Sequence, residues 1–503
     1  MQGIAYWIEK RASMTPNRIA LVGESRRLTY QEAAESIDRI AQALAQGYQV
    51  QSGDRIAILS ANSIEYIQLL FAIAKLGCIG VPLNTRLTPK ELAFQLNDSQ
   101  SAVLLTGEEF YEIGTQMQES SSVKHVTRID ALEESAFDSG AADMKAVPDW
   151  NTTAPLGSTP FLICYTSGTT GRPKGALLTQ ENMFWNGVNN ILTLDITSDD
   201  RVLTLLPLFH IGGIGLFAFP ALLAGGTVVI PNRFDPEKAL ALIEQEMVTI
   251  VMGVPTIHDA LRKSDRFPQT DLSSLRWFYS GGAPCPHELI RFYLDKGIPF
   301  GQGYGMTETS PTVFLLSKED YGKKIGSIGK PAMFCDIRIV DNEGKDVALG
   351  EIGELLVKGP NVFKEYWNLP DETAKSFQAE WFRTGDLVRM DEEGFVYIAG
   401  RKKDMIISGG ENIYPLEVEQ VIGQHPAVAE AAVVGIGDEK WGEVPIAIVA
   451  LKEEHHLTEK ELLDYCTAVL AKYKCPKSVK FVAALPKNAT GKIDKASLKR
   501  EYA

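Results

Sequence analysis

Short apolar segments alternate with helical segments over most of the first 325 residues. Segments rich in β-branched residues, such as RIAILS (55–60), FLICYTS (161–167) and TIVMGV (249–254), are separated by helical ones such as SIEYIQLLFAIAKLG (63–77). Strands that alternate with helices are typical of parallel α/β sheets. Strands as apolar as VLTLLPL (202–208) are typical of sheets covered by helices on both faces. The sequence therefore predicts an α/β fold with a large N-terminal domain of parallel sheets.

The pattern changes after about residue 325. Alternating strands with turns such as DNEG, as in DIRIVDNEGKDV (336–347), predict a small β subdomain over residues 325–400. The charged segment GRKKDMI (400–406) predicts a hinge, and the residues after it have the pattern of a small α+β domain. We therefore predict an N-terminal core over residues 1–400 and a mobile C-terminal lid over residues 401–503.

Two further segments allow specific predictions. Residues 211–231 carry no charge over a length that could cross a bilayer. Five glycines and Pro220 interrupt this segment, which predicts buried core instead. Residues 119–145, rich in serine and alanine, predict a surface loop with a helix.

Composition excludes several classes of protein. Lys and Arg number 50 against 64 Asp and Glu, for a net charge of −14, and there is no long basic run, which argues against binding nucleic acid through its phosphates. The six cysteines are widely separated and form no CxxC pair, which fits neither a disulfide framework nor a zinc site. The first 22 residues lack the pattern of a signal peptide. We expect a cytoplasmic protein without an integral membrane segment.

The segment YTSGTTGRPKG (165–175) is the first that indicates a chemistry. It follows the apolar strand FLICY, so a glycine-rich turn would present backbone N–H groups at the carboxyl end of that strand. These donors, the hydroxyls of the turn and the charge of Lys174 could wrap a polyphosphate. A Walker A loop is excluded because GxxxxGK[ST] does not occur. The alternative interpretation of a loop of this composition is a surface turn rich in glycine and threonine that binds no phosphate.

Seven further motifs follow this segment in order. With it, they resemble the adenylate-forming (ANL) superfamily, which includes acyl-CoA synthetases, luciferases and the adenylation domains of nonribosomal peptide synthetases. The N-terminal segment LTYQEAAESIDRIAQAL (28–44) also resembles the start of these proteins, so the resemblance covers essentially the whole chain. The motifs are PLFH (207–210), SGGAP (280–284), GYGMTE (303–308), GELLVKGPNVFKEYW (353–367), WFRTGD (381–386), GRKKDMIISGGENIYP (400–415) and PKNATGKIDK (486–495).

The resemblance implies a reaction in two steps. A carboxylate attacks the α-phosphate of ATP in the presence of Mg²⁺ to give an acyl-adenylate and pyrophosphate, and the thiol of coenzyme A then displaces AMP. The first step joins two anions, so catalysis depends mainly on neutralising charge and on alignment. A small carboxylic acid, ATP, Mg²⁺ and CoA are therefore the expected ligands. Relatives are often dimers, so a homodimer is a further alternative.

The resemblance also implies roles for individual residues. Thr307 would contact the α-phosphate, Glu308 would bind Mg²⁺, and Lys492 would bridge the carboxylate and the α-phosphate. Lys403 occupies the hinge at which the lid turns between the two steps. The β- and γ-phosphates would lie against Thr166, Ser167, Gly168, Thr169, Thr170, Gly171 and Lys174; the adenine between Tyr304–Gly305 and the thin wall Gly282, Ala283 and Pro284; the ribose at Asp386 and Arg401.

Most of the residues expected to contact coenzyme A lie in the second half of the chain. The glycines Gly409 and Gly410 of the ISGGENIYP loop would allow the pantetheine arm to approach closely. Trp441 and Lys474, with Arg86 and Tyr473 as further candidates, would contact the CoA nucleotide.

The acyl pocket is expected around the PLFH segment. His210 is either a gate beside the carboxylate or a hydrogen-bonded core histidine. The other expected walls are Phe209, Gly212, Met252, Val254, Ser280, Gly281, Gly303, Ser310 and Pro311. None of them is basic, the acid that amino-acid-activating members carry near PLFH is absent, and Gln302–Gly303 replaces the arginine of malonate-activating members.

These departures predict a monocarboxylic, largely apolar acid, and we expect a medium- to long-chain fatty acid. Three alternatives remain open. The chain is similar to o-succinylbenzoate–CoA ligases through PLFHIGG (207–213), SGGAP and IISGGENIYP (406–415), although a second basic anchor for the succinyl group is not found. It could also load a carrier protein, or retain the fold as a non-catalytic binding protein.

Overall fold

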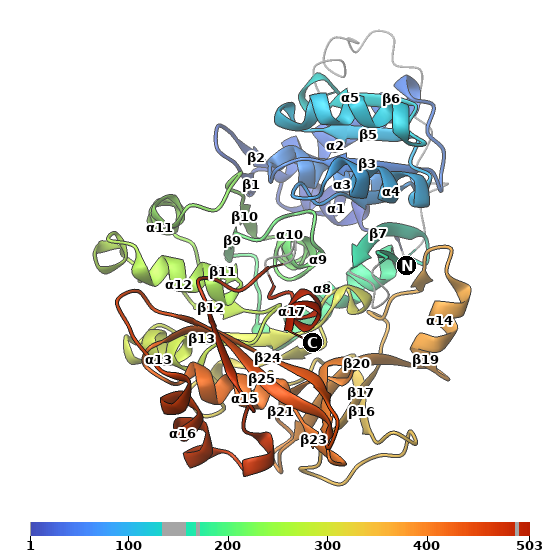
Figure 1. Ribbon diagram of the computed structural model, residues 1–503. Helices are drawn as coiled ribbons and strands as arrows, with labels where there is room; N and C mark the ends of the chain where they lie inside the picture. Colours follow the sequence, from blue (N-terminus) through green and yellow to red (C-terminus); the bar gives the residue numbers. More distant parts are fainter. Residues whose placement is uncertain (1, 133–156, 167–171, 488–491, 503) are drawn as a thin grey trace. The chain divides into compact units, whose positions relative to one another are not determined.

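The computed structural model describes residues 2–132, 157–166, 172–487 and 492–502 (Figure 1). Contacts between residues divide the chain into two compact units. Unit 1 contains Met1–Asp336 and Lys358–Phe382, and unit 2 contains Ile337–Val357 and Arg383–Ala503. The chain therefore passes between the units more than once, and the predicted boundary at residue 400 stays a prediction.

The first sheet of unit 1 has the strand order β18-β8-β7-β4-β3-β5-β6. The pairs from β7 to β6 are parallel, whereas β8 and β18 pair antiparallel at one edge. The strands are β3 (Arg55–Leu59), β4 (Ile79–Pro82), β5 (Val103–Thr106), β6 (His125–Arg128), β7 (Pro160–Thr166), β8 (Lys174–Thr179) and β18 (Glu365–Tyr366).

The second sheet of unit 1 has the order β15-β14-β13-β12-β11-β9-β10-β1-β2. The strands from β13 to β1 pair in parallel, as the alternating sequence predicted, so the α/β fold class is confirmed. The strands are β1 (Ile19–Val22), β2 (Arg27–Thr29), β9 (Arg201–Thr204), β10 (Thr227–Val229), β11 (Ile250–Gly253), β12 (Trp277–Ser280), β13 (Phe300–Tyr304), β14 (Phe314–Leu315) and β15 (Lys330–Pro331).

Helices of unit 1 begin at side chains that satisfy their first N–H groups. Thr29, Thr88 and Thr179 form reciprocal capping boxes with the residue three positions later. The helices are α1 (Ala5–Met14), α2 (Tyr30–Gly47), α3 (Ile64–Lys75), α4 (Pro89–Ser99), α5 (Tyr111–Ser120), α8 (Gln180–Leu194), α9 (Ile211–Gly215), α10 (Ala218–Ala224), α11 (Pro236–Gln245), α12 (Pro255–Lys263), α13 (His287–Asp295) and α14 (Pro370–Ser376), with the short 3-10 turns η1 (Glu108–Phe110), η2 (Phe267–Gln269), η3 (Thr307–Thr309) and η4 (Lys318–Asp320).

An aromatic cluster links the first sheet to the helices of unit 1. The ring of Phe219 on α10 stacks on Phe71 of α3, at 4.8 Å between centroids, and on Phe161 of β7, at 6.3 Å. Trp7 of α1 meets Phe71 and Phe219 edge-on. Four elements that are distant in sequence are thereby fixed against one another by buried aromatic area.

Residues 211–231 form α9, α10 and β10, and most of their side chains are buried, as predicted. In the part of the chain that the structure describes, every helix is too short or too polar to span a bilayer.

The prediction of a surface loop with a helix over residues 119–145 was wrong in part. Residues 125–128 form strand β6, which extends the first sheet by pairing in parallel with β5 from Val103↔His125 to Thr106↔Arg128. The segment HVTR is short and only half-buried, so its strand depends on the pairing edge that β5 offers and not on its own hydrophobic pattern. Residues 133–145 lie outside the described part of the chain.

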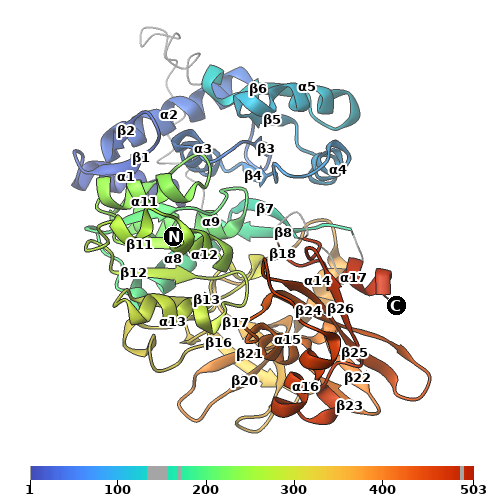
Figure 2. The same cartoon turned by 60° about the vertical axis from the view of Figure 1, so that its left-hand side comes forward.

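Unit 2 contains a sheet of β16, β17, β20 and β21 and a second sheet with the order β23-β22-β25-β24, to which β26 adds beside β25 (Figure 2). The strands are β16 (Asp336–Val340), β17 (Gly353–Lys358), β20 (Trp381–Met390), β21 (Val396–Arg401), β22 (Ile406–Ser408), β23 (Glu411–Ile413), β24 (Val428–Asp438), β25 (Gly442–Leu451) and β26 (Val479–Val482); the short strand β19 (Phe377–Gln378) of unit 1 pairs with the first residues of β20. The helices are α15 (Pro415–Gly423), α16 (Glu459–Val469) and α17 (Lys495–Tyr502), with the turns η5 (Lys402–Asp404) and η6 (Lys472–Lys474).

The second sheet of unit 2 is apolar on both faces. Val433 and Val449 belong to a core with Val418 of α15 and Leu462 of α16. The alternate residues, such as Ile448, form a separate core with Leu498 of α17. A strand with buried side chains at successive positions needs cover on both faces, and the helices supply it.

Candidate functional site

Strands β7 and β8 carry the described ends of the predicted phosphate loop. Thr166 is the last residue of β7 and pairs with Lys174, the first residue of β8. The Thr166 hydroxyl lies 3.4 Å from the Lys174 carbonyl oxygen, within reach of a long hydrogen bond. The predicted residues Ser167, Gly168, Thr169, Thr170 and Gly171 lie outside the described part of the chain. The antiparallel pairing thus holds Lys174 beside the start of the loop.

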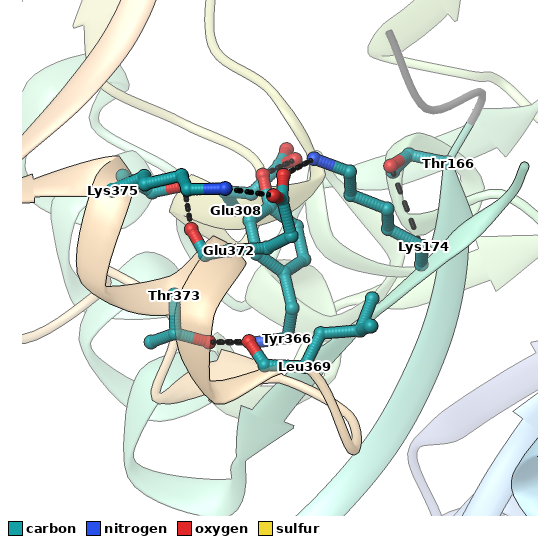
Figure 3. Close-up of polar contacts among 9 residues, drawn as sticks. Thr166, Lys174, Glu308, Tyr366, Leu369, Glu372, Thr373 and Lys375 are labelled. Atoms are coloured by element: carbon teal, nitrogen blue, oxygen red, sulfur yellow. Dashed lines mark hydrogen bonds and ion pairs between the residues drawn. The ribbon is translucent and has the colours of Figure 1, made fainter. Parts of the chain in front are cut away.

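Glu308 lies on η3, directly after Thr307, and its side chain is buried. Its Oε1 accepts a hydrogen bond of 2.7 Å from the Tyr366 hydroxyl (Figure 3). Its backbone carbonyl accepts from the Phe363 N–H at 2.8 Å. Burial raises the pKa of the nearby Cys164 thiol to about 12, with a smaller contribution from the Glu308 charge. A buried carboxylate at a fixed position is the kind of oxygen ligand that Mg²⁺ accepts together with phosphates and water.

Lys174 forms an ion pair with Glu372, another acidic residue of unit 1. Its Nζ lies 2.5 Å from an oxygen of Glu372 on α14 and 5.2 Å from the centre of the Tyr366 ring. Lys375 binds Glu372 at 2.9 Å from the other side (Figure 3). Lys174 and, to a smaller extent, Lys375 lower the pKa of Glu372 to about 2, so this carboxylate stays charged.

The predicted adenine walls occupy the ends of two neighbouring strands. Tyr304 ends β13, and its ring meets Phe314 edge-on at 5.9 Å. A Cβ at Gly305 would lie 1.5 Å from the Pro311 carbonyl oxygen, so only glycine fits there. Gly282, Ala283 and Pro284 follow β12 and are exposed, with Gly282 at a positive φ.

The predicted acyl residues are brought together only in part. His210 is half-buried just before α9, with its ring 4.7 Å from that of Phe209. Gly212 and Met252 line one small void of about 10 Å³. A Cβ at Gly281 would lie 3.1 Å from Met252 Cε, and one at Gly215 of α9 would lie 2.6 Å from Pro311. The other residues that line the void are Thr204, Leu205, Leu206, Gly213, Phe217 and Ala218.

The remaining predicted walls do not line this void. Val254, Ser280 and Gly303 lie at or near the carboxyl ends of β11, β12 and β13, and Ser310 directly follows η3. Ser280 and Ser310 are fully buried. A larger cavity of about 530 Å³ lies elsewhere in unit 1, near Phe334, Lys358 and Phe363, and the predicted site residues do not line it.

In unit 2, the predicted ribose residues pair directly. Asp386 on β20 and Arg401 on β21 are partners across the antiparallel pair. The Arg401 Nε lies 2.9 Å from the Asp386 Oδ1, and the Asp386 side chain is buried while that of Arg401 is half-exposed. The carboxylate therefore has a fixed orientation.

The predicted hinge residue Lys403 is exposed within η5. Its neighbour Lys402 is held by the buried Glu354 at 3.0 Å, and Glu354 also pairs with Arg383. This pair of cations on one buried carboxylate fixes the chain directly before the hinge position.

The predicted CoA loop is a hairpin. Gly409 and Gly410 connect β22 to β23, and both have a positive φ, as a tight hairpin turn of this kind requires. The Gly409 N–H donates to the Trp441 carbonyl at 2.8 Å. A Cβ at Gly409 would lie 2.6 Å from the Trp441 ring, so the structure brings these residues together.

Two further CoA candidates, Tyr473 and Lys474, belong to the turn η6, which contacts strand β23 of this hairpin. Lys474 pairs with Glu417 at 2.7 Å and lies over the Tyr473 ring at 5.8 Å. Arg86 is exposed after β4. Lys492 is exposed beside Ile493, which bridges to Lys487, and the four residues before it lie outside the described part of the chain.

Tyr366 and Glu372 were not predicted as site residues. Tyr366 lies within the motif GELLVKGPNVFKEYW (353–367), and this membership is the only feature of the sequence that could have indicated a role for it. Its contacts depend on β18 pairing with β8, almost 200 residues earlier, which the sequence pattern does not show.

Comparisons with known proteins agree over the full length. A family model described as AMP-binding enzyme matches residues 8–367, and one described as AMP-binding enzyme C-terminal domain matches residues 417–492. A feruloyl-CoA synthase of Amycolatopsis sp. is 42% identical, over 100% of this chain and 99% of the relative. A long-chain-fatty-acid–CoA ligase of Mycobacterium tuberculosis is 39% identical, over 100% and 99%.

The solved structures show the same similarity. The o-succinylbenzoate coenzyme A synthetase of Bacillus subtilis, in complex with ATP and magnesium ion, matches with a TM-score of 0.87 and 39% identity over 98% of each chain.

Proposed function

The chain belongs to the family of AMP-binding enzymes, and from this premise we propose that it is an acid–CoA ligase that works through an acyl-adenylate. ATP, Mg²⁺, a carboxylic acid and CoA are its substrates and cofactors in this proposal. The cluster of Lys174, Glu308, Tyr366 and Glu372 carries it, because the cluster sets a cation and a buried carboxylate at the start of the phosphate loop.

In this proposal, three predicted residues of unit 1 contact the phosphates and the metal ion. Lys174 neutralises the β- and γ-phosphates, and Thr307 donates its hydroxyl to the α-phosphate. Glu308 holds Mg²⁺, which would draw charge from the phosphates as the acid attacks. Among the described residues no cluster of three or more His, Cys, Asp or Glu could form a metal cage, so a single carboxylate that shares the ion with a nucleotide fits this chain.

The residues of unit 2 have the complementary roles. Asp386, oriented by Arg401, accepts hydrogen bonds from the ribose hydroxyls. Lys492 supplies a positive charge to the reacting carboxylate and the α-phosphate. Lys403 is the position at which the backbone turns, and the hairpin at Gly409 and Gly410 admits the pantetheine arm.

The acid is proposed to be monocarboxylic and largely apolar, with a medium- to long-chain fatty acid as the first candidate. The void at Leu206, Phe217 and Met252 has room for no more than about one water, so the proposal of an apolar acid rests on the uncharged residues expected around the acyl group and not on this void. The relatives are named for acids as different as ferulate and long-chain fatty acids. The o-succinylbenzoate reaction is the second candidate, because the Bacillus subtilis synthetase has the same fold over the whole chain. Loading of a carrier protein, a cytoplasmic location and a homodimer stay predictions.

Pyrophosphate release tests the proposal. The enzyme is incubated with ATP and Mg²⁺ and a panel of fatty acids of increasing length, cinnamates, benzoates, o-succinylbenzoate, malonate and amino acids, with and without CoA. We expect CoA-dependent turnover with an optimum among the apolar monocarboxylic acids. Turnover with malonate or an amino acid alone would contradict the assignment of the acid, and pyrophosphate release that CoA never enhances would contradict the ligase.

A further inference from the structure

Tyr366 lies between the two charged groups that the proposed function assigns to the nucleotide. It is on the two-residue strand β18, and its side chain is buried. Figure 3 shows its ring beside the Lys174 ammonium and near Glu308.

The first contact is to Glu308. The Tyr366 hydroxyl donates to Oε1 at 2.7 Å, and both side chains are buried. The phenol is the donor of this hydrogen bond, because an ionised carboxylate can only accept. A hydrogen bond to a charged oxygen at this distance fixes the orientation of the carboxylate.

The second contact is to Lys174. The ammonium lies 5.2 Å from the centre of the Tyr366 ring, within the range of a cation–π interaction. The Lys174 side chain is only 13% exposed and has the Glu372 carboxylate as its other partner. The ring and the carboxylate together define where the charge of Lys174 lies.

Tyr366 is itself firmly held. Its partner across the pairing of β18 with β8 is Ala176, two residues after Lys174. Its backbone N–H donates to the Thr373 hydroxyl of α14 at 3.0 Å. Its ring meets Phe363 edge-on at 4.8 Å. The backbone of Tyr366 is therefore held at two points and its ring at a third, so its position can be transmitted to the groups that it touches.

We propose that Tyr366 is a positioning residue that sets the distance between Lys174 and Glu308, so that the ammonium and the carboxylate meet the phosphates and Mg²⁺ of one nucleotide together. This inference rests on the proposed function. One aromatic side chain reaches both groups because its hydroxyl and its ring face offer two different interactions. A phenylalanine could provide only one of them.

The test uses two substitutions that separate the two interactions. Tyr366→Phe removes the hydroxyl and keeps the ring, whereas Tyr366→Leu removes both. ATP binding to the full chain is measured by calorimetry over a series of Mg²⁺ concentrations, without acid or CoA. Tyr293→Phe is the matched control, because it removes another buried hydroxyl of unit 1, one that donates to the His258 carbonyl.

Tyr366→Phe is expected to raise the Mg²⁺ concentration for half-maximal ATP binding about tenfold, since one hydrogen bond to a charged group is lost. Its binding of ATP without Mg²⁺ is expected to match the wild type. Tyr366→Leu is expected to weaken ATP binding without Mg²⁺ as well, because Lys174 loses the ring. Tyr293→Phe is expected to change neither quantity.

A double variant shows whether Tyr366 acts through Glu308. Adding Tyr366→Phe to Glu308→Gln is expected to cause no further change in the Mg²⁺ dependence. An unchanged Mg²⁺ dependence in Tyr366→Phe, or a full additional shift in the double variant, would overturn the inference. If Tyr366→Leu does not fold, the Mg²⁺ dependence of Tyr366→Phe and of the double variant is sufficient to test the inference. Wild-type ATP binding that ignores Mg²⁺ would instead contradict the proposed function.

Discussion

Two buried carboxylates of the candidate site, Glu308 in unit 1 and Asp386 in unit 2, are held by partners of different kinds. Glu308 accepts from the hydroxyl of Tyr366 at 2.7 Å. Asp386 accepts from the Arg401 guanidinium at 2.9 Å. As whole residues, Glu308 is 5% exposed and Asp386 is 4% exposed, so burial does not distinguish them.

The difference lies in charge. A hydroxyl orients a carboxylate without neutralising it, so the contact with Tyr366 does not offset the charge of Glu308. A guanidinium both orients and neutralises, which leaves Asp386 suited to accept hydrogen bonds from a neutral group such as a sugar hydroxyl. The partner of a buried carboxylate therefore indicates what kind of ligand it serves, and substitutions at the two positions should have different effects.

Glu308→Gln is expected to have the largest effect. Loss of the charge should lower the rate of adenylation about 10²–10³-fold, the usual range for one preorganised group, and raise the Mg²⁺ requirement. ATP–pyrophosphate exchange over a Mg²⁺ series measures both. Asp386→Asn is the matched control: it should weaken ATP binding with the Mg²⁺ requirement unchanged. Equal shifts of the Mg²⁺ requirement in the two variants would break the comparison.

Much of unit 1 could be predicted from the sequence because its signals are local. The strands β3, β7, β9 and β11 follow from continuous apolar runs, and the helices between them follow from their periodicity and capping residues. Lys174 was predicted from the glycine-rich segment 165–175, whereas the resemblance of WFRTGD to a family motif implied Asp386 of unit 2. These features depend on neighbouring residues, which is why a single sequence shows them.

The rest depends on pairing between distant segments. Strand β6 forms because β5 offers an edge, and β18 is only two residues long and forms because β8 does. The contacts of Tyr366 and Glu372 with Glu308 and Lys174 follow from that second pairing. A two-residue strand has no periodicity to detect, so these partners could not be predicted.

The dependence of the free energy of unfolding on acidic pH should also differ between unit 1 and unit 2. His258 in unit 1 is fully buried, with Nε2 2.9 Å from the Tyr279 carbonyl oxygen, and burial lowers its pKa from 6.5 to about 4. Between these pH values the unfolded chain binds a proton at His258 that the folded chain does not bind. The contribution of His258 to the free energy of unfolding is therefore fully present above pH 6.5 and is lost as the pH falls towards 4. The loss should reach about 3 kcal/mol, since one pKa unit corresponds to about 1.4 kcal/mol.

Hydrogen exchange of the amides in β11, β12 and β13, corrected for its intrinsic pH dependence, measures this loss in unit 1. His258→Gln should flatten the pH dependence between 4 and 6.5, and His425→Gln in unit 2 is the control for removing an imidazole. A His258→Gln variant with the wild-type slope would show that this histidine does not cause the acid response.

The smallest effect is expected for the pair that holds Asp386. Arg401→Leu leaves a buried carboxylate without its guanidinium and should lower the free energy of unfolding of unit 2 by about 1–2 kcal/mol, less than for a fully buried pair because Arg401 is half-exposed. Arg389→Leu on the same strand pair removes a guanidinium that lies over the Tyr397 ring at 4.7 Å and should cost less than about 1 kcal/mol. Urea unfolding of Arg401→Leu, Asp386→Asn and the double variant measures the coupling, and Arg389→Leu is measured beside them as the control. If the double variant is as unstable as the sum of the single ones, Arg401 does not serve Asp386, and the contrast with Glu308 loses its basis.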